Sequence, residues 1–139
     1  ITSLLMPTIF TKIINREIPG YIVAEDEQHI AFLDIMPLVK GHVLVVPKQE
    51  VDYIYDLEED LYSSLHLFAK KVAKAQESVI KCTRIGVAVI GLEVPHVHIH
   101  LVPLRSMDDI NFSRPKLQLE PSEMEEIASK IKLAFDQGN

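Results

Sequence analysis

The sequence predicts an α+β fold built on a five-stranded antiparallel sheet, with one long helix and a C-terminal helix. Five short segments rich in Val, Ile and Leu are separated by turn residues, which is typical of strands. One long segment with helical periodicity lies between the third and fourth of them, and a second such segment ends the chain. Runs of strands with one inserted helix favour an α+β arrangement, and 139 residues suffice for one domain.

The elements follow in order along the chain. Residues 9–14 are expected to form about one helical turn. The first two strands should make a hairpin, and Pro47 and Gly91 should end the third and fourth. Residues 105–120 are expected to be irregular. The expected strands are 21–24, 29–34, 42–46, 85–90 and 96–102.

Two segments have the spacing of amphipathic helices. Apolar residues recur at steps of three and four over residues 57–79, and again over 124–135. Asp56 with Glu59, and Ser122 with Glu125, are expected to cap these helices. The lysines of the long helix are interpreted as a solvated face rather than a phosphate site.

Composition excludes several function classes. No apolar run approaches the roughly 20 residues that span a membrane. The net charge of −6 argues against general nucleic-acid binding, although local donors can still hold one nucleotide. The single cysteine, Cys82, cannot form an internal disulfide, so a reducing, cytoplasmic location is expected. Residues 1–7 are expected to be disordered or foreign to the native chain; with Met6 as the native start, residues 1–5 would be the foreign part.

Half of the six histidines fall in the segment from His96 to His100. Residues two apart on a strand share a face, so His96, His98 and His100 should line one side. Such an array can bind a metal or act as a nucleophile at phosphorus. The simplest alternative to either function is that the three histidines are polar residues on the solvent-exposed face of an edge strand. No carboxylate follows at the spacing of a cupin-type site, so we expect no metal and no cofactor. His29 and His66 are interpreted as non-functional.

The run from His96 to Val102 resembles the signature of the histidine triad (HIT) superfamily. Residues 8–14, 17–19, 31–35 and 41–48 are similar to its Hint branch, so the resemblance covers roughly residues 8–104. It implies a single HIT domain over residues 1–139 and a homodimer whose sheets join. It also implies hydrolysis at the α-phosphorus of purine nucleoside phosphoramidates through a nucleotidyl-histidine. The alternatives are a dinucleoside polyphosphate hydrolase, a nucleotide-binding scaffold and a zinc-dependent protein.

The resemblance also implies residue roles. His98 would be the nucleophile, His100 would contact the phosphate, and His96 and His42 would support the array. Asp34 would accept hydrogen bonds from the ribose, although its sequence context also suits a turn residue. The residues expected around the base and sugar are Phe10, Ile13, Ile18, Leu33 and Ile35.

The segment before the triad departs from the branch. It reads Gly91-Leu92-Glu93-Val94-Pro95, where Hint proteins commonly carry a Gly-Gln-Ser-Val type of sequence. Glu93 and Val94 are therefore expected at the nucleotide site without the usual amide and hydroxyl donors. Glu93 either points away from the phosphate, offering only its backbone, or selects a cationic leaving group.

Overall fold

The computed structural model describes residues 7–138. Met6, and with it most of the segment 1–7 on which an expectation was placed, lies outside the described residues. Five antiparallel strands form one sheet in the order β1-β2-β3-β5-β4, which confirms the predicted α+β class. The strands are β1 (Ile22–Glu25), β2 (His29–Leu33), β3 (Val43–Pro47), β4 (Arg84–Ala88) and β5 (Ile99–Leu104).

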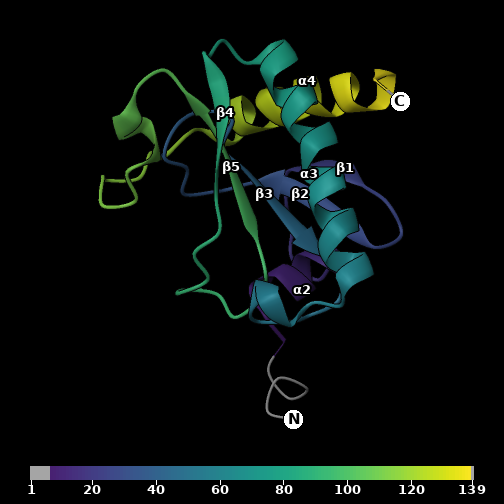
Figure 1. Cartoon of the computed structure of the whole chain (residues 1–139). Helices are drawn as coiled ribbons and strands as arrows, with labels where there is room; N and C mark the ends of the chain where they lie inside the picture. The colour runs from purple at the N-terminus through teal and green to yellow at the C-terminus, as the bar shows by residue number, and fades with distance from the viewer. Residues whose placement is uncertain (1–6, 139) are drawn as a thin grey trace.

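Helices cover both faces of the sheet (Figure 1). The two long helices, α3 (Glu59–Val79) and α4 (Pro121–Gln137), pack against one face and enclose the larger core. The short α2 (Ile9–Ile14) packs against the other face through Phe10 and Ile13. Short 3-10 turns occupy Ile54–Asp56 and Met107–Ile110. Within residues 7–138, no helix is long and apolar enough to cross a membrane.

Neither predicted helix cap forms. Helix α3 starts at Glu59 after Glu58, and Asp56 lies in the preceding 3-10 turn. Helix α4 starts at Pro121, so Ser122 lies inside it. Proline suits the first helical position because its missing N–H would have had no partner there, and this places the start earlier than the serine suggested.

Strand β5 begins at Ile99, three residues later than predicted. It pairs with β3 only from Ile99 onward, opposite Val45, although β3 itself runs to Pro47. The N–H of Val97 instead bonds the carbonyl of Val51, in the loop after β3. His96 therefore lies at a bend and His98 in irregular chain just before the strand.

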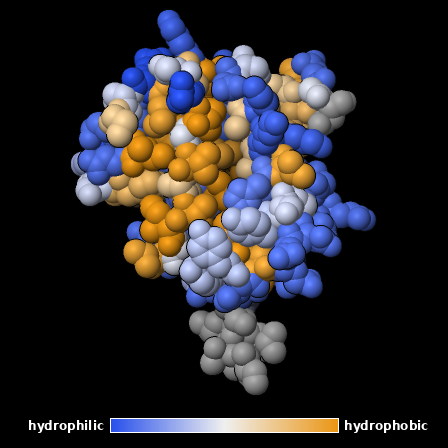
Figure 2. All heavy atoms as spheres, in the orientation of Figure 1, coloured by the Kyte–Doolittle hydropathy of each residue, from blue (hydrophilic) through white to orange (hydrophobic). Residues whose placement is uncertain are grey.

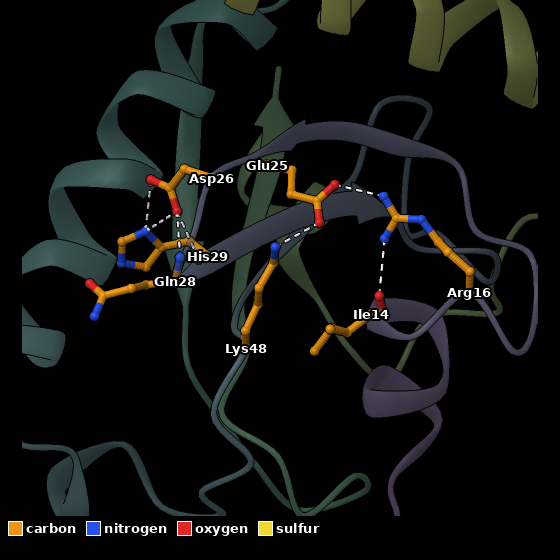
Figure 3. Close-up of polar contacts among 7 residues, drawn as sticks. All are labelled: Ile14, Arg16, Glu25, Asp26, Gln28, His29 and Lys48. Carbon is orange, nitrogen blue, oxygen red and sulfur yellow. Dashed lines mark hydrogen bonds and ion pairs between the residues drawn. The ribbon is translucent and has the colours of Figure 1, made fainter.

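Figure 3 shows a polar cluster at the turn between β1 and β2. His29 Nδ1 lies 2.8 Å from the Asp26 carboxylate, and its Nε2 lies 2.8 Å from Ser64 Oγ on α3. The ring also stacks on Phe68, with 5.0 Å between centroids. These contacts tie the hairpin to α3, and they give His29 a structural role away from the triad.

Candidate active site

The three triad histidines and His42 are buried on the face of the sheet that carries α2. His100 lies opposite Leu44 of β3, whose side chain belongs to the same apolar cluster as Phe10. His98 and His100 line a small cavity of about 170 Å³ whose wall also includes Glu93, Phe112 and Lys116. Two members of the predicted histidine array, His98 and His100, thus share one concavity.

The hydrogen bonds of His98 determine its tautomer. Its Nδ1 lies 2.7 Å from the backbone carbonyl of His96, which can only accept, so Nδ1 carries the proton. Burial lowers the pKa of His98 and favours the neutral ring. Its Nε2 then holds a lone pair, has no partner among the described residues, and is accessible from the cavity. Such an imidazole can attack phosphorus.

A second chain of hydrogen bonds orients His100. The N–H of Leu38 donates to His42 Nδ1 at 3.1 Å, so a neutral His42 carries its proton on Nε2. That Nε2–H donates to His100 Nδ1 at 2.9 Å, which leaves the proton of His100 on its own Nε2. Burial, with smaller contributions from nearby positive charge, lowers the pKa of His42 to about 3 and that of His100 to about 4. Both rings are therefore neutral near pH 7.

These two series of hydrogen bonds place complementary groups side by side. The centroids of the His98 and His100 rings are 5.0 Å apart. A nucleophilic lone pair on His98 thus lies next to an N–H donor on His100. A donor in that place can stabilise negative charge that develops on a phosphoryl oxygen.

His96 is fully buried and held from both ring nitrogens. Its Nε2–H donates to the carbonyl of Pro47 at 2.8 Å, so its Nδ1 accepts from the Thr8 hydroxyl, also at 2.8 Å. Thr11 donates its hydroxyl to Glu50 Oε1 at 2.6 Å, and the N–H of Thr8 donates to the same oxygen. This network fixes the residue whose carbonyl holds His98. No local sequence pattern points to this network, because Thr8 and Thr11 are far along the chain from Glu50 and His96.

The apolar part of the site differs from the prediction at one position. Phe10 and Ile13 lie in the cluster on the histidine face, and Ile18 and Val94 pack against it. Leu33, however, lies in the core beneath α3 and α4, and the side chain on the histidine face is Phe32. Its ring is 5.5 Å from that of Phe10. Neighbouring strand residues point to opposite faces, so the side chain of Leu33 lies away from the histidine face and that of Phe32 lies on it.

The predicted polar residues lie at the edge of the site. Asp34 accepts a hydrogen bond from the N–H of Met36 at 2.9 Å, and its other oxygen lies 3.8 Å from His42 Nε2. Burial raises the pKa of Asp34. Glu93 is exposed at the cavity that His98 and His100 line, and Ile35 is 62% exposed.

One group of side chains has the composition of a metal site. Ligand atoms of Asp34, His42 and His100 all lie within 4.8 Å of one another. Two imidazoles and a carboxylate are a set that zinc accepts. A metal bound there would replace the hydrogen bond between the two rings.

Comparison with known proteins identifies the family. Residues 15–107, which contain His42 and the whole triad, match the HIT domain. The chain belongs to the HIT domain family. It is 34% identical to the adenosine 5′-monophosphoramidase of Schizosaccharomyces pombe, over 91% of this chain and all of the relative.

Solved structures agree with this assignment. A HIT-like protein from Bartonella henselae, described as involved in cell-cycle regulation, superimposes with a TM-score of 0.80 at 31% identity, covering 92% of this chain and 96% of that one. A zinc-bound histidine triad protein from Mycobacterium smegmatis also has a TM-score of 0.80, at 25% identity, with 95% of each chain covered.

Proposed function

We propose that this HIT protein is a nucleotide hydrolase that acts at the α-phosphorus of purine nucleoside phosphoramidates or related nucleotidyl conjugates. The observation that carries the proposal is the fixed tautomer of His98. Its Nδ1–H is held by the carbonyl of His96, which leaves the Nε2 lone pair at a cavity beside the Nε2–H of His100. The named activity of the fission yeast relative supports the same reaction.

The reaction would proceed in two displacements. His98 Nε2 attacks the α-phosphorus and forms a bond to it. The bond from phosphorus to the leaving nitrogen breaks, and that nitrogen keeps the electron pair and takes a proton from solvent as the amine leaves. Water then attacks phosphorus and loses a proton to solvent, and the bond to His98 breaks with its electron pair returning to Nε2. The products are the amine and the nucleoside monophosphate. The His100 N–H bonds a phosphoryl oxygen in both steps.

The nucleoside would lie on the apolar cluster beside α2. Phe10, Ile13, Ile18, Phe32 and Val94 offer an apolar surface for a base and sugar. Asp34 and the exposed Ile35 follow β2 at its edge, where the Asp34 carboxylate would accept from ribose hydroxyls. We propose that Glu93, which is exposed at the cavity, selects a cationic leaving group.

We also propose a homodimer formed along β4. This strand is at the edge of the sheet, so its outer backbone groups have no strand partner among the described residues. Large apolar side chains are exposed on it and just after it, at Val87, Val89, Ile90 and Leu92. Figure 2 shows apolar surface gathered on the side of the molecule where β4 lies. An unprotected apolar edge strand favours pairing with a second copy. A cytoplasmic location stays a prediction, supported by the single cysteine.

The test is AMP release from adenosine 5′-phosphoramidate in the presence of a chelator. We expect the wild type to hydrolyse it and His98→Ala to lose activity, while His66→Ala, which changes an exposed histidine on α3, stays active. Activity that needs added zinc would favour a metal at Asp34, His42 and His100 instead. Faster turnover of a diadenosine polyphosphate would favour the alternative hydrolase, and nucleotide binding without turnover would favour a scaffold.

A further inference from the structure

The wall of the triad cavity includes residues from outside the region of family resemblance. Phe112 and Lys116 belong to the irregular segment between β5 and α4, and both line the cavity with His98 and His100. The Phe112 ring packs edge-on against His100, with 4.7 Å between centroids, and lies 6.3 Å from His42. The segment therefore closes one side of the active site.

Several contacts hold this segment in place. Ser106 and Asp109 form a capping box around the 3-10 turn Met107–Ile110. Arg114 Nη1 donates to the carbonyl of Asp108 at 2.7 Å and lies 3.3 Å from an Asp109 carboxylate oxygen. The N–H of Leu117 donates to the carbonyl of Pro37, in the loop that leads to His42. Phe112 and Lys116 are thus positioned by the fold rather than by contact with a substrate.

Lys116 has a positive charge that no direct ion pair neutralises, and its field also reaches the Asp34 carboxylate. Its Nζ donates to the carbonyls of Phe112 at 2.8 Å and Arg114 at 3.4 Å, and no carboxylate of residues 7–138 lies within ion-pair distance. An ammonium has three N–H donors, so one remains for a ligand. The side chain is half-buried. Its charge also contributes to the lowered pKa of His42 and His100, so its field reaches the catalytic rings.

The cavity needs such a cation. The segment before the triad contributes Leu92 and Glu93 to the wall, and neither side chain can donate to a phosphate. The Glu93 carboxylate would repel a phosphate at this site. An ammonium on the same wall offsets that repulsion and supplies a charge-assisted donor, which is stronger than a neutral one.

We propose that Lys116 is a phosphate-binding residue, contacting a non-bridging oxygen of the nucleotide phosphate in the cavity beside His98 and His100. The inference rests on the proposed function and deepens it, because it names a group outside the triad motif that recognises the anionic part of the substrate. Lys116 thereby takes the place of the donors missing from the segment Leu92-Glu93.

The experiment compares the binding of AMP and of adenosine to the wild type, K116M and K116R by calorimetry. The two ligands differ only in the phosphate. We expect K116M to weaken AMP binding by about 10- to 100-fold, the range for loss of a hydrogen bond to a charged group, and to leave adenosine binding unchanged. K116R should keep most of the AMP affinity. K70M, which alters an exposed lysine on α3, is the matched control and should bind both ligands as the wild type does.

Other outcomes would overturn the inference. Equal AMP affinity in wild type and K116M would remove Lys116 from the phosphate site. Equal weakening of AMP and adenosine would mean that Lys116 only holds the segment in shape through the carbonyls of Phe112 and Arg114. Either result leaves wild-type hydrolysis in place, whereas a wild type that neither binds AMP nor hydrolyses the phosphoramidate would overturn the proposed function itself.

Discussion

Mild acid should destabilise this protein through two buried histidines. In the folded state the pKa of His42 is about 3 and that of His100 about 4, while both have an ordinary value of 6.5. Below pH 6.5 the unfolded chain takes up protons at both positions that the folded protein does not, so stability falls as pH falls. Since both folded values lie below 5, each ring costs about 1.4 kcal/mol per pH unit from 6.5 to 5, or about 2 kcal/mol. Together they should remove about 4 kcal/mol between pH 7.5 and pH 5.

Urea unfolding at a series of pH values measures this loss. His100→Gln removes one of the two titrating rings, and its amide oxygen can still accept from His42 Nε2–H. The difference in unfolding free energy between pH 7.5 and pH 5 should then shrink by about 2 kcal/mol relative to the wild type. His66→Gln, at an exposed position, is the control for loss of a histidine. An equal pH dependence in wild type and His100→Gln would refute the reasoning.

Three further predictions test other parts of the structure. Thr8→Val removes the hydroxyl that donates to buried His96 Nδ1. It should lower the free energy of unfolding, measured in urea, by about 1–3 kcal/mol and slow hydrolysis. Unchanged stability and rate would contradict the hydrogen-bond network. Gly41→Ala adds a side chain where φ is +89° and where a Cβ would lie 3.1 Å from Ile80, so chemical denaturation should show a loss of at least about 1 kcal/mol, and wild-type stability would contradict this. Val87→Lys places a charge on the exposed β4 edge and should give a monomer in sedimentation velocity, whereas a dimer that persists would exclude this interface.

The histidine array could be predicted because the pattern that indicates it lies within one short segment of the sequence. Residues spaced by two share a side in any extended chain, so His96, His98 and His100 face the same region even though the first two precede β5. The hairpin, the third strand and both long helices could be predicted for the same reason, since their periodicity lies within single segments. Alternation also predicts which side chain of β2 lies on the histidine face. Phe32 lies there, because it is two residues after Ile30, and Leu33 does not.

Other features depended on which distant residues meet. The strand start at Ile99 depends on where pairing with β3 stops, opposite Val45, and the start of α4 depends on Pro121 rather than on the apolar period. No sequence pattern connects Glu50 with the N-terminal threonines, or Lys116 with the triad.

The amino-acid sequence by itself determined the fold class, the family and the four histidines of this protein, because each depends on residue types at short, regular spacing. The tertiary structure alone decided which nitrogen of each imidazole holds a proton, since that depends on the carbonyls of His96 and Pro47 and the N–H of Leu38. It alone also brought Lys116 to the cavity, because burial and long-range contacts form only when the chain is folded.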